Sequence, residues 1–78
     1  MPEEILRKVK EILVPKLGKV VADSTIRVNC QRLGIKPEEL SKEKVNDFID
    51  NIKISLLLFL DEKEIEEIVK KIEEIPPV

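Results

Sequence analysis

Apolar residues recur every three to four positions along most of the chain, and this spacing restricts the possible folds more than any other feature. Intervals of three and four place side chains on one face of an α-helix, whereas a half-buried strand alternates at every second residue. No such alternation and no internal repeat is present. The pattern predicts four helices, over residues 3–14, 19–33, 42–60 and 62–75.

The first predicted break follows Val14. Pro15 has no backbone N–H and disfavours a helical conformation at the residue before it. Gly18, three residues later, can adopt the left-handed conformation that commonly ends a helix. We therefore predict a kink or break over residues 14–18, and the sequence leaves open whether Pro15 bends one helix or separates two.

The other boundaries carry stop and start signals. Gly34 followed by Ile35 predicts a Schellman motif, in which Ile35 can contact Cys30, and Pro37 prevents the helix from continuing. Ser41 and Asp61 stand where the third and fourth helices would need an N-cap. Connections this short favour antiparallel neighbours, so residues 1–78 are expected to form a single all-α domain, a four-helix bundle or a compact four-helix array.

A domain of 78 residues buries too little surface for its core alone to make it very stable. Such domains usually need further stabilisation from a disulfide, a bound metal or self-association. Cys30 is the sole cysteine, so an internal disulfide is excluded, and the absence of histidine argues against a structural metal site. Self-association is the source of stability that remains, although very good helix packing could take its place.

The third predicted helix carries more apolar residues than one buried face needs. On a helical wheel one face holds Val45, Phe48, Ile49, Ile52, Leu56, Phe59 and Leu60. Ile54, Leu57 and Leu58 point the opposite way. Three readings remain: the helix is central and covered by the other three, the back face is the seam of a homodimer, or it is a groove for another protein. We favour the homodimer, because such a patch is unusual on a soluble monomer.

The second predicted helix has a weaker version of the same feature. Val21 and Val28 lie well away from its apolar spine and are candidate neighbours of the seam. Asn29 lies near the middle of that spine, where it could set the register of a partner or bond to a loop carbonyl.

Charge is unevenly distributed along the chain, which suggests a rival function. Residues 1–36 carry a net charge of +4 and residues 37–78 a net charge of −6, so the two halves can attract each other. The alternative is a nucleic-acid-associated regulator that contacts a polyanion through Arg7, Lys8, Lys10, Lys16 and Lys19. A pI near 5.2 and the lack of aromatic residues for base stacking argue against nucleic acid as a partner.

Residues for catalysis are scarce. Histidine and tyrosine are absent, and Cys30 lies on an apolar spine, where a cysteine is usually an inert small hydrophobe. The two glycines belong to no phosphate-binding loop. We expect no catalytic, cofactor or metal site and no enzymatic activity.

Composition and segment length bear on source and location. Abundant lysine, glutamate and isoleucine are typical of a thermophile. Residues 52–60, the most apolar stretch, are too short to span a bilayer, and the N-terminus lacks the apolar run of a secretory signal. We therefore expect a cytoplasmic interaction or regulatory module that forms a homodimer, or else a non-catalytic subunit of a larger complex.

Overall fold

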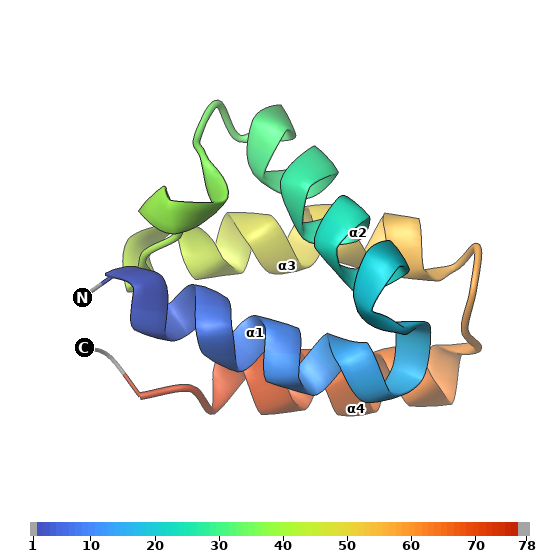
Figure 1. Cartoon of the computed structure of the whole chain (residues 1–78). Helices are drawn as coiled ribbons and strands as arrows, with labels where there is room; N and C mark the ends of the chain where they lie inside the picture. The colour runs from blue at the N-terminus through green and yellow to red at the C-terminus, as the bar shows by residue number, and fades with distance from the viewer. Residues whose placement is uncertain (1, 77–78) are drawn as a thin grey trace.

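The computed structural model describes residues 2–76, and four α-helices occupy this range (Figure 1). A single 3₁₀ turn, η1, covers Pro37–Glu39, and no strand occurs within the described range. The helices are α1 Pro2–Leu17, α2 Lys19–Arg32, α3 Lys42–Leu56 and α4 Glu62–Glu73. The predicted all-α array of four helices is confirmed.

The helices close into a ring. Each helix contacts the next one along the chain, and α1 packs against α4 to complete the circuit. In Figure 1, α1, α3 and α4 run roughly along one direction, whereas α2 is inclined to them. The arrangement is therefore a compact array rather than a bundle of four near-parallel helices.

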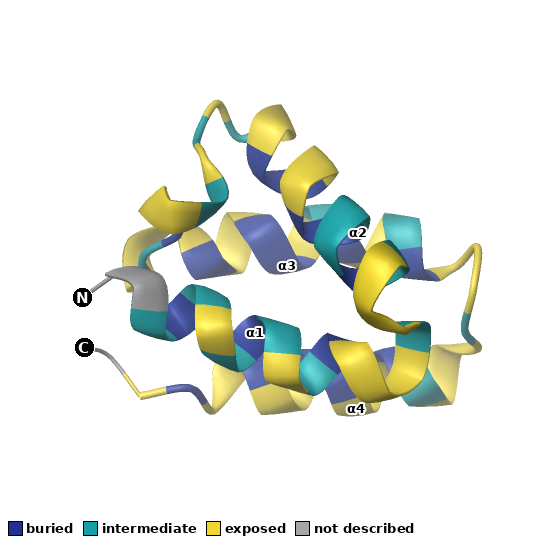
Figure 2. Cartoon of the chain, viewed as in Figure 1, coloured by how far each residue is buried: buried dark blue, intermediate teal, exposed yellow. Residues whose placement is uncertain are grey.

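The apolar spines predicted from the sequence form the core. Figure 2 shows the buried residues on the inward sides of the helices. Leu40, which follows η1, is also fully buried. The helical residues of the core are Ile5, Val9, Leu13, Ala22, Ile26, Cys30, Val45, Phe48, Ile49, Ile52, Leu56, Ile65, Ile68, Val69 and Ile72.

Gly18, and not Pro15, separates the first two helices. α1 continues past the predicted end at residue 14 because a proline near a C-terminus removes a single hydrogen bond and leaves the last turn intact. The Gly18 N–H donates to the Val14 carbonyl at 2.8 Å, and its own carbonyl accepts from the Ala22 N–H at 2.9 Å. Its φ of 83° and ψ of 159° lie in a region open essentially to glycine alone.

The Schellman motif predicted after α2 is present. Gly34 has a φ of 74°, and its N–H donates to the Gln31 carbonyl at 3.0 Å. The Ile35 N–H donates to the Cys30 carbonyl at 3.0 Å. These are the two bonds that define the motif, and they satisfy carbonyls that the end of a helix would otherwise leave unpaired.

The prediction that the third helix extends to residue 60 is wrong, because α3 ends at Leu56. Beyond it, the Leu58 N–H donates to the Ser55 carbonyl and the Phe59 N–H to the Leu56 carbonyl, so the chain tightens into turns. Leu60 packs against the core, and Asp61 then caps α4 by accepting from the Glu64 N–H at 2.9 Å. The apolar sequence of residues 57–60 concealed this boundary.

The fourth helix ends at Glu73, two residues before the predicted boundary, although Ile75 is still buried. The Lys42 ammonium at the start of α3 donates to the Ile75 carbonyl at 2.9 Å and lies 3.5 Å from the Glu73 carbonyl. A lysine in this place satisfies carbonyls at the end of a neighbouring helix and ties α3 to α4.

Gly18 and Gly34 adopt different backbone conformations, so substitutions at the two positions should differ in their effect on stability. A Cβ at either position meets no atom within 4 Å, so the cost of substitution lies in the backbone. We expect Gly18→Ala to lower the free energy of unfolding by about 1–3 kcal/mol, and Gly34→Ala by roughly 1–2 kcal/mol.

Asparagine is the control, since it enters the left-handed helical region more readily than alanine. In urea unfolding, Gly34→Asn should be milder than Gly34→Ala, whereas Gly18→Asn and Gly18→Ala should cost about the same. Full tolerance of Gly18→Ala would contradict this account of the turn.

Candidate protein-interaction surface

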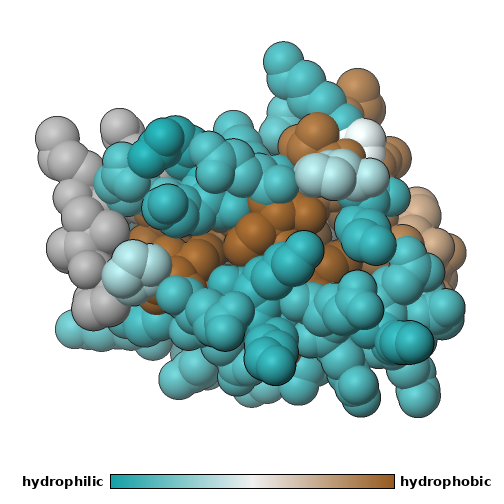
Figure 3. Space-filling model, turned by 90° about the horizontal axis from the view of Figure 1, so that it is seen from below, coloured by the Kyte–Doolittle hydropathy of each residue, from teal (hydrophilic) through white to brown (hydrophobic). Residues whose placement is uncertain are grey.

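Large hydrophobic side chains are exposed at the ends of α2 and α3. Leu58 is 82% exposed and Val20 78%, values typical of side chains that project from a surface. In Figure 3, hydrophobic side chains lie at the right-hand edge, the end of the molecule that holds the α1–α2 turn and the α3–α4 loop in Figure 1, and also form a band across the middle of this face. We call the following residues the apolar surface: Val20, Val21, Val28, Ile54, Leu57, Leu58 and Phe59.

Part of the apolar surface forms a concave site, the α2–α3 groove, with a volume of about 340 Å³. Val20, Val21 and Val28 line it from α2, and Leu58 and Phe59 line it from the turn after α3. Its floor is polar, formed by Thr25, Asn29 and Ser55, and Arg32 is the charged residue of the lining.

Of the five residues predicted for the seam, the structure brings three together. Val21, Val28 and Leu58 line the α2–α3 groove. Leu57 lies on the other side of α3, against α4, and Ile54 is 64% exposed without lining either groove. The reading in which the other helices cover this region is therefore wrong, while the predicted interface itself stays a prediction.

Two residues of the apolar surface escaped the sequence analysis. Phe59 was placed on the buried face because the wheel continued a helix that ends at Leu56, and it is 53% exposed. Val20 stands beside Val21 at the start of α2, and a pair of adjacent valines after a helix break was a signal that one of them faces outward.

Asn29 fills a role that neither sequence hypothesis described. It is fully buried, and its amide donates to the Thr25 carbonyl at 2.7 Å and to the Ser55 hydroxyl at 3.2 Å. The same hydroxyl lies 3.4 Å from the Asn29 carbonyl oxygen. The pair links α2 to α3 beneath the groove, and every buried side-chain nitrogen or oxygen within the described range has a partner.

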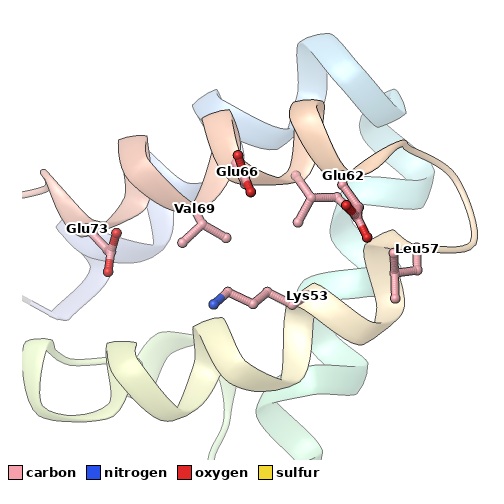
Figure 4. A pocket seen from close by; sticks show the side chains of 7 residues that line it. Lys53, Leu57, Glu62, Glu66, Val69 and Glu73 are labelled. Carbon is pink, nitrogen blue, oxygen red and sulfur yellow. The ribbon is translucent and has the colours of Figure 1, made fainter.

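A second groove separates α3 from α4 and has a volume of about 490 Å³. Figure 4 shows the Lys53 side chain lying along this groove, and Glu62, Glu66 and Glu73 line the α4 side. Its apolar floor, Ile65 and Val69, is already buried within the protomer. Leu57 is the exposed hydrophobic residue of its lining, so this groove offers less hydrophobic surface to a partner than the α2–α3 groove.

Cys30 is fully buried on the spine of α2. Burial in an apolar environment raises the pKa of the thiol to about 11, and the negative charge of Glu38 adds to the effect. At neutral pH the thiol is protonated, and a thiol is a poor nucleophile. No group of three or more histidine, cysteine, aspartate or glutamate side chains in residues 2–76 is arranged to hold a metal ion.

The basic residues of the polyanion hypothesis are partly neutralised within the fold. Arg7 lies 2.7 Å from Glu4, Lys10 lies 3.8 Å from Asp23, and Lys16 lies 3.6 Å from Glu64 on α4. The Arg7 guanidinium lowers the pKa of Glu4 by hydrogen bonding and by its charge. Lys8 is half-buried and Lys19 is exposed.

No protein family matches this chain, and no curated protein or solved structure is significantly similar to it. None of the described helices combines the length and hydrophobicity needed to cross a membrane.

The Asn29–Ser55 pair should be energetically coupled. We expect Ser55→Ala to lower the free energy of unfolding by about 0.5–1.5 kcal/mol, and Asn29→Ala by more, because it also leaves a void. Urea unfolding of both single variants and the double variant closes a double-mutant cycle. A coupling energy of zero would show that the hydrogen bonds do not stabilise the fold.

The buried thiol gives a pH-dependent prediction. Because the folded state raises the pKa of Cys30 from 9.0 to about 11, its contribution to stability is complete below pH 9 and is lost as the pH rises toward 11. At pH 8, a chromogenic disulfide reagent should react far more slowly with the native chain than with the urea-unfolded chain. Equal rates would refute the assigned burial.

Proposed function

We propose that this chain is a protein-interaction module that self-associates as a homodimer through the apolar surface. The exposed hydrophobic residues at the ends of α2 and α3, Val20 and Leu58 above all, carry the proposal. It assigns the chain a binding or regulatory role and no catalytic one.

The energetics support association. Complete burial of one large aliphatic side chain contributes roughly 1.5–3 kcal/mol. Five large hydrophobic residues are more than half exposed: Val20, Ile54, Leu57, Leu58 and Phe59. Exposed hydrophobic residues that gather on one part of a soluble protein commonly mark an interaction site. A standard interface buries about 800 Å² of each partner, and these residues would form its apolar part.

The chemistry of the surface favours a second copy as the partner. Arg32 is the charged residue among those lining the α2–α3 groove. Hydrophobic association has no polarity, so an apolar surface with few charges is complementary to itself, and a two-fold axis places the same residues on both sides.

The test replaces the most exposed residue by a charged one. In light scattering, the unaltered chain should have twice the mass of one 9.0 kDa chain, whereas Leu58→Glu should be monomeric, since a carboxylate would be desolvated in the seam. Leu58 is exposed in the protomer, so circular dichroism should show an unchanged helix content.

Asn46→Glu is the matched control. Asn46 is exposed on α3, near the end of the helix that is remote from Leu58, and the substitution introduces the same charge. It should leave the dimer intact. A mass of one chain for the unaltered protein at millimolar concentration would overturn the proposal.

A further inference from the structure

The α2–α3 groove has a projecting apolar side chain at its edge. Leu58 is the most exposed large hydrophobic residue of the described range, and Phe59 beside it is half-exposed. Both belong to the turn after α3, outside any regular helix. The protomer therefore presents a projection and a hollow of about 340 Å³ next to each other.

We infer that two copies pair about a two-fold axis so that Leu58 and Phe59 of each copy enter the α2–α3 groove of the other and contact Val28 there. This inference rests on the proposed homodimer and specifies its contacts. It assigns the groove one occupant, the 57–60 turn of a second copy of this chain.

Packing favours this mutual insertion of the 57–60 turns over an interface in which each residue contacts the same residue of the second copy. In a seam where Leu58 met its own equivalent on the axis, the two α2–α3 grooves would receive no side chain from the partner. An apolar void forfeits the dispersion contacts of its lining. Mutual insertion fills both grooves with side chains and removes the two projections from water in one step.

The polar floor of the groove is compatible with an apolar occupant. The Asn29 amide is already satisfied by the Thr25 carbonyl and the Ser55 hydroxyl. An entering leucine therefore does not deprive the Asn29 amide of a hydrogen-bond partner, a loss that would cost about 1–3 kcal/mol. The same hydrogen bonds hold α2 and α3 at a fixed spacing, so the groove exists before the second copy arrives.

Charge complementarity points to the same occupant. Arg32 is the charged residue of the groove lining. The entering turn is followed directly by Asp61 and Glu62, both exposed. When the apolar turn of one copy enters the groove of the other, the carboxylates that follow the turn can pair with Arg32 of that groove. A two-fold axis forms this pairing twice.

Cross-linking between variants that each carry one added cysteine tests the contact. Val28→Cys and Leu58→Cys are mixed at low concentration, concentrated to allow pairing, and oxidised with oxidised glutathione. Cys30 is buried and protonated at the pH of the experiment, so it does not compete. Because each variant carries one new thiol, a 28–58 disulfide can only join two chains.

The mixed 28–58 disulfide should form on the order of tenfold faster than either the 28–28 or the 58–58 disulfide, because pairing holds the two thiols at a high effective concentration. Lys44→Cys mixed with Leu58→Cys is the control. Residue 44 is exposed at the other end of α3 and should give only the slow collisional rate.

The outcomes separate this inference from the proposed dimer. A two-chain mass in which the 58–58 disulfide prevails, or in which no disulfide forms faster than the control, overturns the exchange of turns and leaves the dimer standing. A mass that grows beyond two chains with concentration shows head-to-tail assembly and overturns the two-fold arrangement. A single-chain mass overturns both.

Discussion

The burial of one apolar face per helix holds this molecule together, and its other features depend on that packing. Phe48, Leu13, Ile26, Ile52 and Ile72 are almost completely inaccessible, and each contributes a few kcal/mol to stability. The ion pairs between the described residues are too exposed to compete, since each joins side chains that are more than a third accessible to water. The ion pairs therefore contribute little to the stability of the fold, which apolar packing determines.

Sequence periodicity was sufficient for the core but not for the helix ends. The apolar spines could be predicted because a buried helix face requires apolar side chains at helical intervals. Gly34 predicted the Schellman motif because few other residues tolerate the positive φ that this motif requires. The end of α3 was hidden because residues 57–60 are uniformly apolar, so no change of composition marks the turn. The exposure of Leu57 and Leu58 was foreseen from a helical wheel that does not apply to them, and the same wheel misplaced Phe59.

The early end of α3 produces the candidate site. A helix continuing to residue 60 would carry Phe59 toward the core, whereas the turn leaves it beside Leu58 at the mouth of the groove. Beneath them, hydrogen bonds between Asn29 and Ser55 join α2 to α3, the two helices that form the walls of the groove. A site whose walls are fixed in advance loses little conformational entropy on binding, so a small contact area can suffice.

The ends of the folded chain lie far from the apolar surface. The first turn of α1 and the residues after α4 meet at one end of the molecule, and the α3–α4 loop occupies the other (Figure 1). The Lys42 ammonium, bonded to the carbonyl of Ile75, fixes the exit of α4 at that remote end. A fluorescent protein or enzyme fused at either end would thus lie away from the apolar surface and leave it unobstructed.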